Sequence, residues 1–396
     1  MTKVRAPTAA VARLARLLVL MAVLPASLVG QSPCTVTAAG ALGEHAVEDL
    51  LLAPQARSAL SADAVRPPTT FADSLAQNVV AVFATGVLQQ GALLRRFVSG
   101  DQRTTFWCAE VRDRQSGMIV ADEPALRLTG TADGTASRTL RDAVRGHITN
   151  TSNTYVRVPT RSATVLVEPR IARERFWRDS LRALLADYEM LFQRLGGERP
   201  DGSAVLLLSD DPRRALLTLG LWYATKPPVE STLMGLGRTV AVIVRVGGRG
   251  WGRHELGHVV VSEVLGALPT SQVALTLAID EGISRGVGGT LGRPLTAYVC
   301  DSARTALELL DPDSPDVPLA TLWSTEPTYN GARDAIGLVY QYLVAEGRGL
   351  DIRGILHAKP ATRNDVFRVM LALARPAFVA SPAAVRAWAL QQCPGR

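Results

Sequence analysis

The segment from Gly252 to Val261 reads GRHELGHVVV, and it constrains the fold of this chain more than any other stretch. His254 and His258 are four residues apart, so on a helix they share one face, where two imidazoles can hold one metal ion. Glu255 follows the first histidine and can accept a proton from a water molecule at the metal. The pattern therefore predicts a helix that carries a metal centre, and it requires a further ligand from elsewhere in the chain.

Length and composition are those of an ordinary globular protein. Of the 396 residues, 47% are hydrophobic and 20% are charged, so the chain can bury a sizeable core and is too apolar to be disordered. A single core rarely grows beyond about 250 to 300 residues. We therefore expect two packed subdomains behind a targeting segment.

The first thirty residues predict a signal peptide. The apolar stretch Leu17 to Val29 is shorter than a membrane-spanning helix, and it follows a region whose only charges are Lys3, Arg5, Arg13 and Arg16. We expect cleavage between Ala26 and Ser32 and export to the periplasm or the extracellular space. The alternative is an uncleaved signal that anchors the protein to a membrane.

Charge gives no indication of a nucleic-acid partner. Removing the four basic residues of the signal lowers the formal net charge from +7 to +3. More than half of the net positive charge therefore belongs to the signal peptide.

Four cysteines follow the signal, and one pair lies in each half of the chain. In an oxidising compartment this distribution favours Cys34 with Cys108 and Cys300 with Cys393. The spacing is too wide for a CxxC metal or redox motif. Four buried free thiols are the alternative.

The order of periodic patterns predicts an α+β fold. Mixed strands and helices come first, and from about residue 250 almost every periodic segment is helical. We expect a signal at 1–30, an N-terminal module of unknown role at 31–160 and a catalytic domain at 161–396. That domain divides into an α/β part at 161–250 and a helical part at 251–396.

Local patterns predict individual elements. We expect helices at 47–52, 71–97, 171–195 and 271–283, and strands within 104–128 and at 162–167, 204–208 and 239–246. Asp210, Asp211 and Pro212 are expected to form a turn. Strand 239–246 leads through the loop GGRGWG to the histidine helix, and we expect it to be an edge that pairs with an extended peptide.

The third metal ligand is sought downstream of the histidines. A metzincin would need glycine at 261 and histidine at 264, where this chain has Val261 and Val264, so that class is excluded. The segment SQVALTLAIDEGI, residues 271–283, can return as a helix antiparallel to the first. It carries Asp280 and Glu281, which point about 100° apart on a helix, so only one faces the metal. We favour Glu281.

HELGH followed by a helix ending in Asp-Glu-Gly resembles the gluzincin metallopeptidases, the thermolysin-like group that includes the "peptidase MA-like" bacterial proteins. The resemblance covers roughly residues 162–350. It implies a zinc ion held by His254, His258 and Glu281, with Glu255 as the catalytic base. Position 285 departs from the pattern, because Arg285 stands where thermolysin-like enzymes have an aspartate that supports a zinc histidine.

No motif identifies the donor that would stabilise the transition state. Tyr329 and His357 are the candidates, since either side chain can hydrogen-bond a developing oxyanion. The alternative is structural: Tyr329 caps a helix and His357 is a partly buried ring.

These observations predict an exported zinc metallopeptidase that acts on a peptide or protein substrate. A competing hypothesis is a non-catalytic zinc-binding envelope protein, in which the site only joins helices. A third is an interaction module carried by residues 31–160 on a peptidase-like scaffold. Glu255 favours the first, because a structural zinc site needs no carboxylate beside its first histidine.

Overall fold

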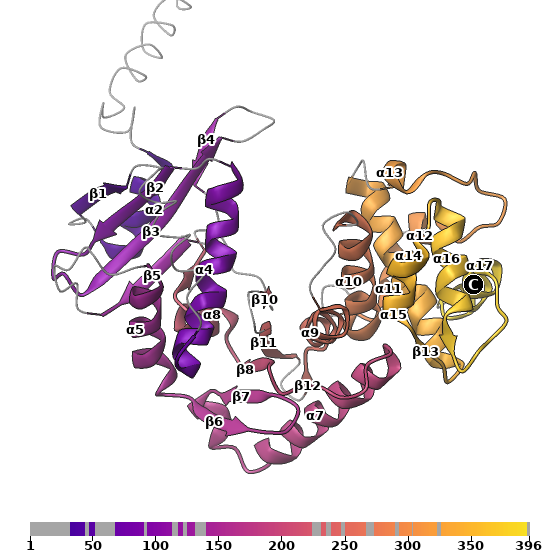
Figure 1. Cartoon of the computed structure of the whole chain (residues 1–396), viewed down its shortest axis with the longest axis horizontal. Helices are drawn as coiled ribbons and strands as arrows, with labels where there is room; N and C mark the ends of the chain where they lie inside the picture. Colours follow the sequence, from indigo (N-terminus) through magenta and orange to yellow (C-terminus); the bar gives the residue numbers. More distant parts are fainter. Residues whose placement is uncertain are drawn as a thin grey trace, which may run out of the picture.

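The chain is α+β with a mainly helical C-terminal half, as the sequence predicts (Figure 1). The computed structural model describes residues 32–43, 47–51, 68–90, 93–112, 118–121, 125–130, 140–223, 231–234, 239–246, 250–266, 273–289, 293–302, 304–322 and 326–393. The predicted signal peptide lies outside these ranges. Within them, no helix has both the length and the apolar character that a membrane crossing requires.

The first sheet is antiparallel and is covered on both faces. Its strands, in spatial order, are β1 (Val47–Leu51), β2 (Leu93–Val98), β3 (Thr104–Arg112), β5 (Ala125–Thr129) and β9 (Leu221–Trp222), with β4 (Ile119–Ala121) beside β3. Helix α2 (Pro33–Leu42) packs on one face, and α4 (Phe71–Gln90) and α5 (Leu140–Ser152) pack on the other.

The alternation along β3 explains this arrangement. Phe106 and Cys108 belong to the small core under α2, whereas Trp107 and Ala109 belong to the core under α4 and α5. A disulfide joins Cys34 on α2 to Cys108. The predicted pairing of these two cysteines is confirmed.

Two expectations in this region were wrong. Residues 47–51 form strand β1 instead of a short helix, and the helix expected to reach residue 97 ends at Gln90, with β2 following. Both segments pair with neighbouring strands. A five-residue helix forms few hydrogen bonds between its own main-chain groups. Pairing with a neighbouring strand satisfies more of these groups, so the segment forms a strand in spite of its helical pattern.

The second sheet precedes the histidine helix. Its order is β10 (Ser231–Met234), β11 (Thr239–Val246), β8 (Val205–Ser209), β7 (Thr164–Val167) and β6 (Val156–Pro159), and β12 (Gly250–Trp251) pairs with the end of β11. Strands β7, β8 and β11 are parallel to one another. Leu206 and Leu208 face one core and Leu207 faces the other, so the apolar run of β8 is buried on both sides.

Strand β11 is internal, which corrects the expectation that it forms a free edge. It pairs with β8 on one side, and β10 pairs antiparallel with residues 239–242. The edge nearest to the histidine helix is therefore β10. The sequence pattern missed this because β10 is only four residues long.

The connections around β7 and β8 also differ from expectation. The long helix predicted at 171–195 is two helices, α6 (Pro169–Ala172) and α7 (Trp177–Arg194). The predicted turn at Asp210 to Pro212 instead begins α8 (Pro212–Thr218), because the Asp211 side chain accepts hydrogen bonds from the main-chain N–H groups of Arg213 and Arg214.

Two strand pairings cross the predicted boundary at residue 160. Strand β9 pairs with β5 of the first sheet, and β6 and β7 form a hairpin around the boundary itself. The division of the chain into an N-terminal module and a catalytic domain stays a prediction.

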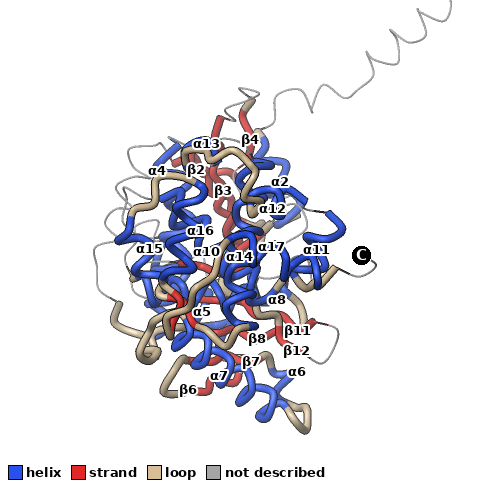
Figure 2. Tube along the Cα trace, turned by 90° about the vertical axis from the view of Figure 1, so that its right-hand side faces the viewer, coloured by secondary structure: helices blue, strands red, loops and turns tan. Residues whose placement is uncertain are grey.

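The second half is built from packed helices, which lie side by side in Figure 2. They are α9 (His254–Leu265), α10 (Val273–Gly288), α11 (Leu295–Ser302), α12 (Arg304–Leu309), α13 (Leu319–Leu322), α14 (Glu326–Ala345), α15 (Ile352–Ala358), α16 (Arg363–Ala372) and α17 (Pro382–Gln391), with a short ladder of β13 (Gly349–Leu350) and β14 (Ala374–Arg375). A disulfide joins Cys300 on α11 to Cys393 beyond α17, as predicted.

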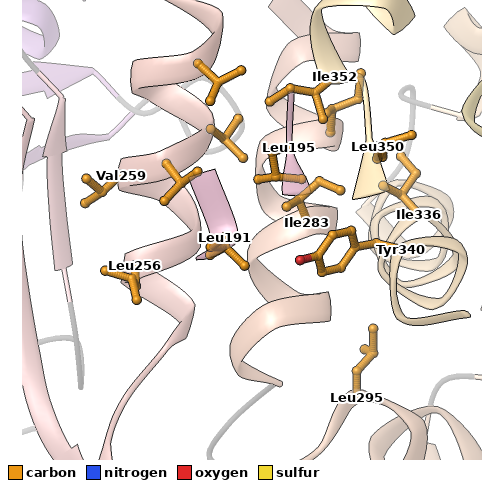
Figure 3. Packing of buried hydrophobic residues seen from close by; sticks show 14 of the residues in the cluster. Leu191, Leu195, Leu256, Val259, Ile283, Leu295, Ile336, Tyr340, Leu350 and Ile352 are labelled. Atoms are coloured by element: carbon orange, nitrogen blue, oxygen red, sulfur yellow. The ribbon is translucent and has the colours of Figure 1, made fainter. Parts of the chain in front are cut away.

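The largest apolar core lies around α9, α10 and α14. Figure 3 shows Leu256 and Val259 of α9, Leu191 of α7, Ile283 of α10 and Ile336 of α14 in this layer. Each of the last four is at most 6% exposed, and Leu256 is fully buried. This packing holds the helix that carries the two histidines between the second sheet and the helical half.

Candidate metal centre

Helix α9 places the two predicted imidazoles face to edge. The Nε2 atoms of His254 and His258 lie 3.1 Å apart, and the rings are almost perpendicular at 84°. A carboxylate oxygen of Glu255 belongs to the same group, whose potential ligand atoms all lie within 4.8 Å of one another. Among the described residues this is the one cluster of histidine, cysteine or carboxylate groups that could hold a metal ion.

Glycines allow a second helix to approach this cluster closely. A Cβ atom on Gly257 would lie 2.7 Å from the Cα of Ser284, and one on Gly288 would lie 2.1 Å from the main-chain nitrogen of His254. Any larger residue would push α9 and α10 apart. The glycine inside HELGH thus has a packing role, because it lets α10 lie directly against the histidine helix.

Helix α10 brings two adjacent carboxylates to different nitrogens of the imidazoles. Glu281 has one oxygen 3.9 Å from Nε2 of His254 and the other 3.9 Å from Nε2 of His258. Asp280 instead has Oδ1 2.9 Å from Nδ1 of His258. Glu281 therefore faces the side of the histidines on which their Nε2 atoms converge, and Asp280 lies behind His258.

Helix α14 supports Glu281 from the opposite side. A Cβ atom on Gly282 would lie 2.5 Å from Cγ2 of Ile336, so this glycine too permits close helix packing. Arg333 of α14 has Nη1 3.8 Å from Glu281 Oε2, and Arg285 of α10 has Nε 3.5 Å from the same oxygen. The Glu281 carboxylate is thus held between two guanidinium groups.

Arg285 shows how this chain departs from the thermolysin-like pattern. Its guanidinium pairs with buried Asp334 as well as with Glu281. The carboxylate that touches a site histidine comes from Asp280, five residues earlier. Arg333 and Asp334 were not identified from the sequence, since an Arg-Asp pair inside a helix carries no recognisable signal.

Burial and charge give the two imidazoles opposite protonation behaviour. Burial, together with the charge of His258, lowers the pKa of His254 to about 4. For His258 burial also disfavours the charged form, but the hydrogen bond and charge of Asp280, with the charges of Glu255 and Glu281, raise the pKa to about 9. At neutral pH His254 is therefore a neutral imidazole, whereas His258 is protonated and carries a positive charge.

Glu281 stays ionised although it is partly buried. Burial alone would raise its pKa, but His258, His254, Arg333 and Arg285 together lower it below the ordinary value. The site therefore presents one neutral imidazole, one imidazole that a metal ion can deprotonate, and a carboxylate.

The structure separates the two candidates for the transition-state donor. Tyr329 lies in the first turns of α14, with the Arg333 guanidinium 4.3 Å from its ring centre. Burial raises the pKa of its hydroxyl, so the hydroxyl keeps its proton at neutral pH. Through Arg333, Tyr329 is connected to the Glu281 carboxylate.

His357 is not brought to the cluster. It is exposed in the last turn of α15. Arg353 of the same helix donates to the carbonyl of Val264, which lies ten residues, or about 15 Å, along α9 from His254. The helix that carries His357 therefore contacts the opposite end of the histidine helix.

A cavity of about 360 Å³ lies near the cluster but is separate from it. Its lining includes Arg253 and Leu256 of α9, Val287 of α10 and Tyr340 of α14. This cavity is not lined by His254, Glu255 or His258, nor by Asp280 or Glu281. It reaches the core beneath α9 instead of the imidazole face.

Comparisons with known proteins identify no relative of this chain. No family model matches the chain, and neither a curated protein nor a solved structure matches it. The spacing and convergence of His254, Glu255 and His258 are compatible with a gluzincin.

Proposed function

We propose that this protein is an exported zinc-dependent peptidase of the gluzincin type. The observation that carries the proposal is the convergence of three metal ligands and a base. The Nε2 atoms of the two histidines lie 3.1 Å apart, Glu281 has one carboxylate oxygen 3.9 Å from each of them, and Glu255 lies beside them. Two disulfides are consistent with an exported protein.

The donor set fits zinc. Imidazole nitrogens bind zinc at about 2.0 to 2.1 Å in tetrahedral geometry, which places two ligand atoms about 3.3 Å apart. The spacing of the two Nε2 atoms, 3.1 Å, is close to this value, and the Glu281 carboxylate would supply the third ligand. Asp280 Oδ1 lies 2.9 Å from Nδ1 of His258, so its charge favours a proton on Nδ1 and leaves the Nε2 lone pair for a metal ion.

The residues of the chain then have distinct roles in hydrolysis. Zinc, when bound, supplies Lewis acidity that lowers the pKa of water to about 7 and polarises a peptide carbonyl. Glu255 takes the proton of the attacking water at its carboxylate and delivers it to the leaving amine. The protonated hydroxyl of Tyr329 donates a hydrogen bond to the developing oxyanion.

Strand β10 supports a peptide substrate over a smaller one. It is the sheet edge that contacts α9, and its outer main-chain groups have no partner strand among the described residues. An extended peptide can pair with such an edge and so lie alongside the histidine helix.

Metal analysis and peptide hydrolysis by the purified exported chain test the proposal. We expect one zinc per chain, hydrolysis of a mixed peptide library, loss of activity with a chelator and recovery with zinc but not with magnesium. A metal-free protein that hydrolyses peptides, or a zinc-loaded one that hydrolyses none, would contradict it. The second result would instead support a non-catalytic zinc-binding protein.

A further inference from the structure

A second cavity, of about 500 Å³, lies far from the histidines in the sequence and shares no residue with the cluster. It is bounded by the end of α5, by α6 and by α8. Parallel strands β7 and β8 end beside it, since Glu168 follows β7 directly and α8 follows β8. Crevices at the carboxyl ends of parallel strands are common ligand sites.

The wall of this cavity contains buried polar groups that are already paired. Glu168 is 3% exposed, and its carboxylate accepts hydrogen bonds from the Ser209 hydroxyl at 2.6 Å and the Asp210 main-chain N–H at 3.2 Å. Arg214 forms an ion pair with the same carboxylate. The charge of Glu168 is thus compensated within the wall.

Two further arginines leave an excess of positive charge. Arg170 and Arg173 line the cavity and are three residues apart on one helical turn, so they project to the same side. Within the described part of the chain, neither side chain forms an ion pair or a hydrogen bond. With Glu168 and Arg214 cancelling, the lining carries two uncompensated positive charges.

The remaining polar groups of the lining can serve an anion. The side-chain amide of Asn150 has no hydrogen-bond partner among the described residues and can donate. The hydroxyls of Thr151 and Thr154 already donate their protons to main-chain carbonyls, so Asn150 and the arginines are the donors left for an anion. Guanidinium groups bind oxyanions with paired hydrogen bonds, for which their planar fork is suited.

We propose that this cavity binds a small organic ligand through a phosphate or sulfate group, with Arg170 and Arg173 as its main contacts. The volume lies in the range of small-molecule sites and exceeds that of a free oxyanion. Tyr155 and Pro169, which also line the cavity, provide apolar surface for the rest of the ligand. This binding site is independent of the proposed peptidase activity.

Calorimetric titration of the full exported chain tests this proposal. Inorganic phosphate, inorganic sulfate and phenyl phosphate are the probes, and acetate at matched ionic strength is the control anion. We expect saturable binding of phosphate or sulfate but not of acetate. Whichever of these two anions binds more tightly indicates the anionic group of the ligand. Tighter binding of phenyl phosphate than of inorganic phosphate supports an organic ligand, and equal binding overturns that part of the proposal.

Two variants connect the binding to the arginines. Arg170→Gln combined with Arg173→Gln should weaken binding about ten-fold or more, since each removes a charge-assisted contact. The control is Arg175→Gln, an exposed residue that stacks on Phe176 and does not line the cavity, and it should bind as the unaltered chain does. Matching melting curves check that all variants fold. Absence of saturable binding, or equal affinity in the double variant, would overturn the proposal.

Discussion

At the scale of single residues, Glu255 and the two histidines around it have separable roles. The histidines present Nε2 atoms to each other at 3.1 Å, whereas Glu255 is a buried carboxylate on the same turn of α9. In the proposed mechanism the histidines hold the metal and Glu255 moves a proton. Substitutions that change one function and leave the other intact can therefore distinguish them.

Glu255→Gln should abolish hydrolysis and keep the metal. Glutamine is nearly isosteric but cannot accept the water proton, so we expect activity to fall about 10²- to 10⁴-fold. Zinc content, measured by mass spectrometry of the digested protein, should stay at one per chain. Loss of zinc in this variant would show that Glu255 is a ligand.

Glu281 and Asp280 should differ in their effect on the metal. Glu281 faces both Nε2 atoms at 3.9 Å, so Glu281→Ala should reduce zinc affinity sharply. Asp280 touches only Nδ1 of His258, and Asp280→Ala should cost about 10- to 100-fold in affinity or activity. Zinc titration of both variants at one pH decides between them. Retention of zinc by Glu281→Ala with loss in Asp280→Ala would indicate an aspartate-ligated site.

At the scale of elements, the metal centre depends on three helices that approach closely. Gly257 and Gly288 form the contact between α9 and α10, and Gly282 forms the contact between α10 and α14. Together these contacts set the distance from the imidazoles to Glu281, and from Glu281 to Arg333. Helix packing thus determines the site geometry as much as the ligands do.

Gly282→Ala should therefore destabilise the protein and weaken the metal site. The added methyl would lie 2.5 Å from Ile336 Cγ2 and 2.8 Å from the carbonyl oxygen of Arg333, which should cost about 1 to 3 kcal/mol. Gly146→Ala in α5 is the control, because a Cβ there meets nothing within 4 Å and should stabilise the helix by up to about 1 kcal/mol. Urea unfolding and zinc affinity of both variants are the measurements. Equal stability of the two would contradict the packing role of Gly282.

A buried ion pair joins α4 to α5 and should make stability depend on pH. Asp73 and Arg141 are each 2% exposed, with Asp73 Oδ1 2.8 Å from Arg141 Nε. Burial would raise the pKa of Asp73, but hydrogen bonds from the Thr69 main chain and from Arg141 lower it below the ordinary 3.8. The contribution of this carboxylate is therefore present above about pH 4 and is lost as the pH falls through the lower folded pKa.

Asp73→Asn should reduce the free energy of unfolding by about 3 to 5 kcal/mol at pH 7, because it leaves Arg141 buried without its counter-charge. The matched control is Asp179→Asn, which breaks an exposed pair with Arg182 and should cost less than about 1 kcal/mol. Urea unfolding between pH 3 and pH 7 measures both. An Asp73→Asn variant that loses as much stability at pH 3 as at pH 7 would refute the linkage.

At the scale of the whole molecule, two disulfides join segments distant in the sequence. Cys34 and Cys108 are 74 residues apart, and Cys300 and Cys393 are 93 apart. The first joins α2 to the first sheet, and the second joins the C-terminal end to α11. Each closes a long loop, which restricts the unfolded chain strongly.

The protein, isolated from an oxidising compartment, should therefore contain no free thiol. Alkylation of the denatured, unreduced protein should label no cysteine, and alkylation after reduction should label four. Cys300→Ser with Cys393→Ser should lower the free energy of unfolding by about 2 to 5 kcal/mol, given the loop length. Labelling of any cysteine before reduction would contradict the pairing.

The sequence by itself determined the elements whose signal is local. The i, i+4 histidines required a helix, the apolar runs of β8 and β11 required buried strands, and one cysteine pair in each half indicated the correct disulfides. It also located Glu281 on a returning helix beside the histidines, where the structure places it. Each of these inferences depends on the spacing of residues within a segment or on the number of cysteines in each half of the chain.

Only the tertiary structure decided which residues surround Glu281 and which strand forms the sheet edge. Arg333 and Asp334 come from α14, about fifty residues beyond Glu281 in the chain. Arg333 reaches Glu281, and Asp334 reaches neighbouring Arg285, only because glycines let the helices touch. Strand β10 is too short to stand out, and it forms because β11 offers it main-chain partners. Contacts of this kind arise from packing between distant segments, for which the periodicity of a single segment carries no information.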